Sequence, residues 1–117
     1  MSHPIRTFAS GATRDTDDTK LDFEGFLSPL AVEAFARYIH ENRTMADGAQ
    51  RASDNWQQGI PLDSYMKSLW RHMFTLWKHH RGVASATDED IEKALCGVMF
   101  NTQGYLHELL VMLRSAS

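Results

Sequence analysis

The sequence predicts an all-α protein built as a small bundle of three main helices. Apolar residues recur at helical spacing over three long segments, and clusters of turn-forming residues separate those segments. The length of 117 residues suits one domain that can bury a real core. We therefore expect a single helical domain over residues 28–117, preceded by an N-terminal arm over residues 1–27.

The N-terminal arm lacks helical periodicity. Residues 13–20, TRDTDDTK, are a polar run that would be solvated by itself. The segment that follows carries four apolar anchors, so we expect the arm to dock on the helical domain. These anchors are Leu21, Phe23, Phe26 and Leu27.

The first main helix is predicted to begin at Pro29 and to end near Arg43. Ser28 can cap the free amide groups, and proline suits the first helical position. The turn-rich residues 44–61 predict a loop, in which we expect Trp56 to be buried and to pin residues 53–60 to the second helix. The expected buried side of the first helix comprises Leu30, Val32, Phe35, Ala36 and Ile39.

The second main helix is predicted over residues 62–80, with Gly82 closing it. It carries a broad apolar stripe that we expect to face the core, and a narrower polar row that either faces solvent or lines a pocket. The stripe comprises Met66, Leu69, Trp70, Met73, Phe74 and Trp77; the row comprises Ser68, His72, Thr75 and His79.

The third main helix is predicted to open at Thr87 with a capping residue and three acids, and to span about 25 residues, or roughly 38 Å. Gly97 and Gly104 lie on one side of it, where another helix or a ligand can approach. We expect that helix to come from a second copy, which makes a homodimer. The expected apolar face comprises Ile91, Leu95, Val98, Thr102, Tyr105, Leu109 and Met112.

Composition narrows the classes of function. The net charge of −3 argues against a general nucleic-acid binder. No apolar run approaches membrane-spanning length, and the N-terminus lacks the apolar core of a signal peptide. The single cysteine, Cys96, fits a buried structural thiol in a reducing cytoplasm better than a nucleophile.

Three groups of residues are candidates for chemistry. The carboxylates Glu33, Glu89 and Glu92 can hold Mg²⁺ or Mn²⁺ through oxygen, although first-turn acids also serve the helix dipole. Basic residues on the arm and the second helix can neutralise phosphate. The third group is aromatic and could stack a base, but core packing is the preferred interpretation for each member: Trp56, Trp70 and Tyr105.

Four blocks of the sequence resemble a phage-borne family, the N-terminal domain of dATP/dGTP diphosphohydrolases. The blocks are ATRDTDDTKLDFEGFLSP, SDNWQQGIP, YMKSLWRHMFTLWKHHRG and EDIEKALCGVMFNTQGYLHELL, which together span residues 12–110. The resemblance implies an all-α protein of phage nucleotide metabolism in an infected bacterial cytoplasm, related to MazG-like pyrophosphohydrolases. Such enzymes use Mg²⁺ or Mn²⁺ to split a nucleoside triphosphate into a monophosphate and pyrophosphate.

The resemblance also suggests site residues. Glu33, Glu89 and Glu92 would hold the metal, and His72 is the candidate catalytic residue. The nucleotide would be bound by Lys20, Asn55, Arg71, His72 and Asn101. The MazG-like pattern has an ExxE pair followed by an ExxD pair on the next helix, and here Ala36 occupies the second position of the first pair.

Two functions therefore stay open. The chain is either a metal-dependent (d)NTP diphosphohydrolase or a non-catalytic protein. The non-catalytic form would bind or sequester a nucleotide, as in counter-defence, or would be an accessory subunit of another phage enzyme.

Overall fold

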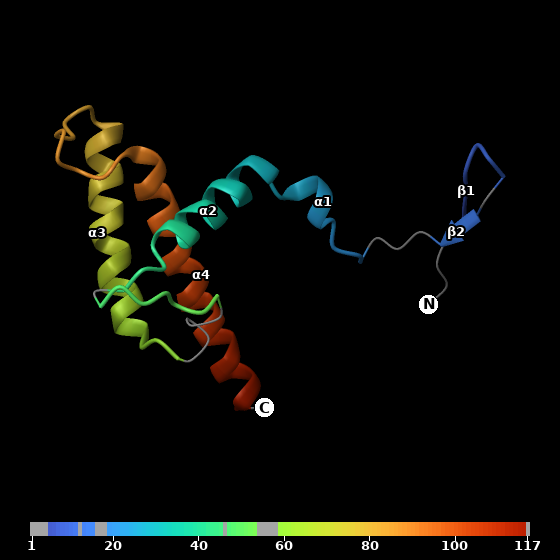
Figure 1. Cartoon of the computed structure of the whole chain (residues 1–117). Helices are drawn as coiled ribbons and strands as arrows, with labels where there is room; N and C mark the ends of the chain where they lie inside the picture. The colour runs from blue at the N-terminus through green and yellow to red at the C-terminus, as the bar shows by residue number, and fades with distance from the viewer. Residues whose placement is uncertain (1–4, 12, 16–18, 46, 54–58, 117) are drawn as a thin grey trace.

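The computed structural model describes residues 5–11, 13–15, 19–45, 47–53 and 59–116. This part of the chain is mostly helical, as predicted (Figure 1). A short antiparallel hairpin in the arm, with Arg6 opposite Arg14, was not predicted. The elements are β1 (Ile5–Thr7), β2 (Thr13–Asp15), α1 (Phe23–Phe26), α2 (Pro29–Glu41), α3 (Leu62–His80) and α4 (Ile91–Ser115).

The centre of the fold is an antiparallel pair, α3 and α4. A Cβ atom added at Gly97 would run into the imidazole ring of His72, and one added at Gly104 would run into the ring of Tyr65. Tyr65 and His72 are seven positions apart on α3, and Gly97 and Gly104 are seven positions apart on α4. Seven positions are two helical turns, so the two contacts repeat along one seam between the helices. The glycines are therefore places where α3 comes close within the same chain, and they do not require a second copy.

The structure corrects the predicted orientation of α3. Tyr65 is only 2% exposed, and the predicted polar row lies half-buried along α4. Trp70 is 69% exposed, and most of the predicted apolar stripe is likewise exposed. The small residues of α4 explain the inversion, because close approach at glycine favours the narrow Ser, Thr and His row over tryptophan and phenylalanine.

The predicted buried face of α4 is also largely wrong. Its buried residues are Ala94, Cys96, Gly97, Asn101 and Gly104. Five of the seven members of the predicted apolar face are exposed, namely Ile91, Leu95, Thr102, Leu109 and Met112. The helix begins one turn later than expected, because Asp90 caps it by accepting a hydrogen bond from the Lys93 amide at 2.8 Å.

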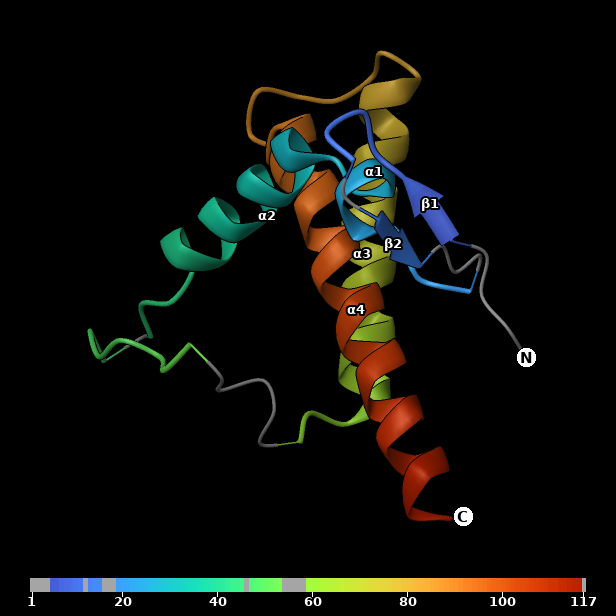
Figure 2. The ribbon, with the colours of Figure 1, turned by 90° about the vertical axis from the view of Figure 1, so that its right-hand side faces the viewer.

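α2 lies beside the N-terminal half of α4 and does not extend along its C-terminal half (Figure 2). Ser28 caps it and Pro29 opens it, as predicted. Of its predicted buried side, Phe35 and Ile39 are half-buried, whereas Leu30, Val32 and Ala36 are exposed. Gly82 ends α3 with a φ of +73°, also as predicted. Trp56 lies outside the described residues, so its predicted burial stays a prediction.

The structure does not place the arm on α3 and α4. α1 continues from the start of α2 away from the helix pair (Figure 1). All four predicted anchors, Leu21, Phe23, Phe26 and Leu27, are exposed. No described helix is both long and apolar enough to cross a membrane.

Candidate functional site

A histidine and a glutamate that the sequence suggested separately meet at the junction of α3 and α4. His72 donates from Nδ1 to Glu89 Oε1 at 2.6 Å. Two helical turns further along α3, His79 donates from Nε2 to the backbone oxygen of Glu89 at 2.7 Å. Two histidines of α3 thus hold the residue that leads into α4, and both bonds are partly buried.

The His72–Glu89 pair lies close to two groups whose pKa values are raised, the Tyr38 hydroxyl and the Cys96 thiol. Burial raises the pKa of the Tyr38 hydroxyl on α2, and the nearby Glu89 and Cys96 raise it further. Burial, with Glu92 and Asp90 next, raises the pKa of the Cys96 thiol. Cys96 is therefore a buried, protonated thiol at neutral pH, which agrees with its predicted structural role.

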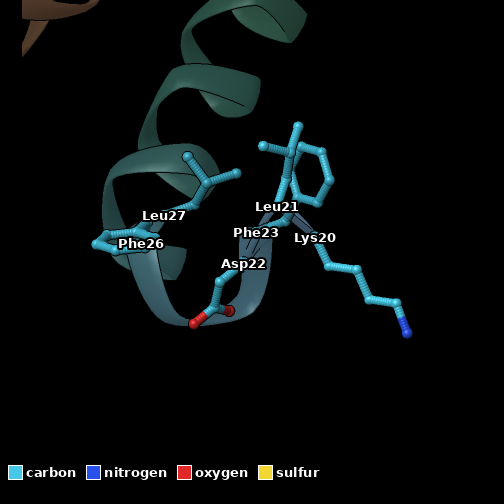
Figure 3. Close-up of a pocket in the computed structure, with 6 residues that line it drawn as sticks. All are labelled: Lys20, Leu21, Asp22, Phe23, Phe26 and Leu27. Atoms are coloured by element: carbon cyan, nitrogen blue, oxygen red, sulfur yellow. The ribbon is translucent and has the colours of Figure 1, made fainter. Parts of the chain in front are cut away.

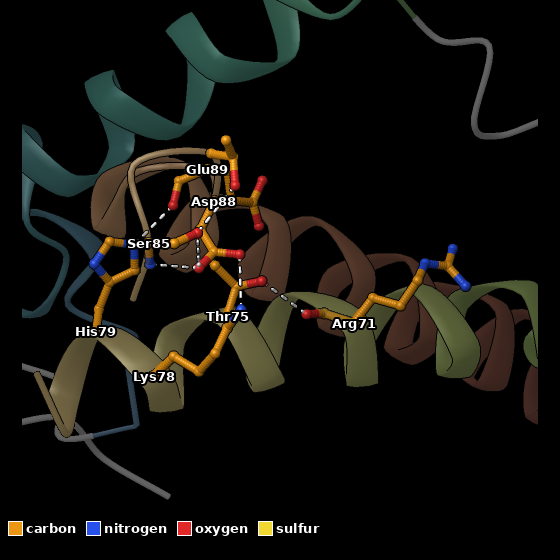
Figure 4. Close-up of polar contacts among 8 residues, drawn as sticks. Arg71, Thr75, Lys78, His79, Ser85, Asp88 and Glu89 are labelled. Carbon is orange, nitrogen blue, oxygen red and sulfur yellow. Dashed lines mark hydrogen bonds and ion pairs between the residues drawn. The ribbon is translucent and has the colours of Figure 1, made fainter. Parts of the chain in front are cut away.

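A second polar cluster closes the loop between α3 and α4 (Figure 4). Lys78 Nζ donates to Asp88 Oδ1 at 2.7 Å, and the Ser85 amide donates to Asp88 Oδ2 at 2.8 Å. The hydrogen bond from Lys78, followed by that from Ser85, lowers the pKa of Asp88 to about 2. This cluster ties the end of α3 to the start of α4, and it engages Lys78.

The three predicted metal ligands do not gather in the described part of the chain. Glu33 is highly exposed on α2 and pairs with Arg37 at 3.0 Å on its own helix. Glu89 is bound by His72, and Glu92 is exposed in the first turn of α4. Among the described residues, no group of three or more His, Cys, Asp or Glu side chains could hold an ion. Glu33 and Glu89 thus have different partners, Arg37 and His72, on separate helices.

The predicted nucleotide ligands lie in separate places. Lys20 is on the arm, at the edge of an open apolar groove formed with Leu21, Asp22, Phe23, Phe26 and Leu27, and its amino group points away from the groove (Figure 3). Arg71 is exposed on α3 and extends away from the Asp88 cluster (Figure 4). Asn101 is buried and donates to the Gly97 backbone oxygen at 2.7 Å, a bond within α4. Asn55 lies outside the described residues.

An exposed surface of α3 combines aromatic rings with positive charges in one place. Trp70 and Phe74 are exposed, and Lys67 and Arg71 are exposed beside them. We call these four residues the aromatic–basic edge. Lys78 Nζ lies 5.3 Å from the centre of the Phe74 ring, but it also donates to Asp88, so Lys78 belongs to the loop cluster and not to this edge.

Sequence reasoning missed this edge because it assigned Trp70 to the core. The signal was present: Lys67 and Arg71 lie four residues apart, directly beside the aromatic positions. An aromatic face supplies a stacking surface, and adjacent cations supply phosphate contacts.

No protein-family model, curated protein or solved structure matches this chain.

Proposed function

We propose that the chain is a homo-oligomeric protein that binds a purine (deoxy)nucleotide at the aromatic–basic edge of α3. The observation that carries the proposal is the exposure of Trp70 directly beside Arg71. Large exposed apolar patches usually mark interaction sites, and the exposed Trp70 and Phe74 rings form such a patch on α3. A purine base stacked on Trp70 would cover that surface.

The chemistry of the two side chains is complementary to a nucleotide. Stacking of a base on an aromatic ring contributes about 1–3 kcal/mol. The Arg71 guanidinium can form two parallel hydrogen bonds with phosphate oxygens, and Lys67 adds a second positive charge one turn earlier. Stacking on Trp70 and phosphate contacts from Arg71 do not require a cluster of carboxylates that holds a metal ion. This mode of binding therefore favours the non-catalytic alternative for the described part of the chain.

Titration of the chain with dATP, dGTP, dCTP and dTTP in a calorimeter tests this proposal. We expect purine nucleotides to bind more tightly than pyrimidine nucleotides. Trp70→Ala should weaken binding by roughly 5- to 150-fold, which corresponds to the loss of about 1–3 kcal/mol. Arg71→Ala should weaken it at least about tenfold, the loss of one charged hydrogen bond.

Arg37→Ala is the matched control, because Arg37 is an exposed arginine on another helix. Its affinity should equal that of the unmodified chain. Equal affinity in the Trp70 and Arg71 variants as well would overturn the proposed site, and no binding of any purine nucleotide would overturn the proposed function.

Hydrolysis of a (d)NTP to (d)NMP and pyrophosphate is the second candidate, and the His72–Glu89 pair favours it. A carboxylate that holds one imidazole nitrogen orients the ring and supports its action as a base. The ring could take a proton from water as the water oxygen bonds to the α-phosphorus and pyrophosphate leaves. The resemblance implies Mg²⁺ or Mn²⁺ for charge stabilisation, but the described carboxylates do not form a ligand set, so we assign no step to an ion.

Chromatography of dATP and dGTP after incubation with the chain and Mn²⁺ tests this candidate. If the chain hydrolyses these nucleotides, monophosphate and pyrophosphate should accumulate, and His72→Gln should lose turnover while its helical content is retained. Glu33→Gln and Glu92→Gln test the metal ligands that the resemblance implies. Full turnover in His72→Gln would show that the His72–Glu89 pair does not act in the hydrolysis.

A further inference from the structure

The arm exposes more apolar surface than its size explains. Leu21, Phe23, Phe26 and Leu27 are between 55% and 87% exposed, and they line the groove of Figure 3. Together they present on the order of 500 Å² of apolar surface. We call residues 20–27 the docking segment.

The joint between α1 and α2 fixes the direction of this segment. Leu27 and Ser28 are both extended, with ψ angles of 142° and 115°. Pro29 keeps the preceding residue extended, and Ser28 Oγ accepts a hydrogen bond from the Ala31 amide at 3.1 Å. Folding the segment back along α2 would break this cap. The segment therefore projects away from α3 and α4 of its own chain (Figure 1).

The α3–α4 pair has one covered side and one bare side. The contacts of Tyr65 with Gly104 and of His72 with Gly97 fix how each helix is rotated. In an antiparallel pair, the residues that follow these contacts by one position all fall on the same side of the seam, and the residues that precede them fall on the other. The preceding side includes Cys96, which lies close to Tyr38 of α2.

The bare side is apolar. Residues one position after the seam contacts, and those one turn further along the same side, make a surface that we call the α3/α4 apolar face. Met66, Met73, Trp77 and Leu95 on it are exposed, and Val98 and Tyr105 are half-buried. The face comprises Met66, Trp70, Met73, Trp77, Leu95, Val98 and Tyr105.

We propose that the docking segment of one copy packs on the α3/α4 apolar face of a second copy, and that the exchange is reciprocal. A short amphipathic segment laid across two helices is a common mode of recognition. The chain's own segment is directed away from this face, whereas a second copy can present its segment without breaking the Ser28 cap.

The available area is sufficient for a dimer. Two segments and the two faces that cover them can remove up to about 2,000 Å² from water, and a specific interface needs about 1,000 Å² or more. The face meets the aromatic–basic edge at Trp70, because Trp70 follows Met66 by one helical turn just as Trp77 follows Met73. Phe26→Glu leaves Trp70 and Arg71 unchanged, so loss of the dimer and loss of nucleotide affinity can be measured separately.

Light scattering of the full chain at micromolar concentration gives the first test. We expect the mass of two chains. Phe26→Glu places a charge on the most exposed anchor and should weaken dimerisation at least tenfold, without changing the helical content. Ile5→Glu, on the exposed strand β1 outside the docking segment, is the control and should stay dimeric.

Crosslinking gives the second test. Phe26→Cys and Met66→Cys are made in separate chains and mixed with a short bismaleimide reagent; native Cys96 is buried and serves as the background. We expect a crosslinked pair in the mixture and far less in either variant alone. A monomeric unmodified chain, a dimer that survives Phe26→Glu, or a mixture without the crosslink would each overturn the exchange.

Discussion

The two faces of α3 differ in a way that hydrophobicity does not predict. The face that packs within the chain carries Tyr65, Ser68, His72 and His79, and the face that carries Trp70, Phe74 and Trp77 is exposed. The inner face is selected by fit and hydrogen bonding: two glycines admit two rings, and two histidines bond to Glu89. The ring contacts of the outer face, Phe74 with Trp77 and with Lys78, lie within α3 itself, and its aromatic surface stays exposed to a ligand or a second copy.

The comparison predicts opposite outcomes for two aromatic residues of one helix. Tyr65→Ala should lower the free energy of unfolding by about 3–5 kcal/mol, because it removes a buried ring. Trp70→Ala should change it by less than about 0.5 kcal/mol, because its ring is exposed. Urea denaturation followed by circular dichroism measures both, and equal losses would refute the assignment of the two faces.

The next largest effect on the free energy of unfolding should come from widening the close contact between α3 and α4. Gly104→Ala should cost about 1–3 kcal/mol through its clash with the Tyr65 ring, partly offset by roughly 1 kcal/mol of gained helix propensity. Gln103→Ala, one position away and exposed, is the control and should be neutral or slightly stabilising. A Gly104→Ala chain as stable as the control would mean that the helices are further apart.

The hydrogen bond between His72 and Glu89 should contribute less to the free energy of unfolding. Glu89→Gln keeps the size of the side chain but removes its charge, and we expect a loss of about 1–2 kcal/mol, as for other hydrogen bonds to charged groups. Glu92→Gln, exposed on the first turn of α4, is the control. Thermal unfolding at neutral pH compares the two variants, and a loss confined to Glu92→Gln would contradict the pairing.

The smallest effect concerns pH. The folded-state pKa of Asp88 is about 2, below the ordinary value of 3.8. Its contribution to stability is therefore complete above about pH 4 and is lost as the pH falls toward 2. Asp88→Asn should flatten the stability profile in this window. An unchanged profile would show that Lys78 and Ser85 do not hold the carboxylate in the folded state.

The start of α2 and the end of α3 were predictable because they depend on local residues, whereas α4 is capped by Asp90 and not by Thr87. Ser28, Pro29 and Gly82 act on the backbone beside them, and the structure agrees at each one. The orientation of α3 was not predictable from periodicity, which locates an apolar stripe but does not say what covers it. A more useful signal was the matched spacing of seven in Tyr65/His72 and Gly97/Gly104.

The candidate site was predictable only in part. His72 and Glu89 were both selected from the sequence, but their pairing across 17 residues depends on how the loop turns. Lys20 and Arg71 were selected together for phosphate, yet the arm and α3 separate them because the Ser28–Pro29 joint directs the arm outward. Long-range placement of this kind depends on tertiary contacts that residue spacing does not encode.

Nuclear Overhauser effects between assigned side chains test the inverted packing of α3 most directly. With one isotope-labelled copy mixed with unlabelled protein, contacts within a chain can be separated from contacts between chains. We predict intrachain effects from the Tyr65 ring to the Gly104 Hα protons and from the His72 ring to those of Gly97. Intrachain effects from Trp70 or Phe74 to the same glycines, with none from Tyr65 and His72, would contradict the account.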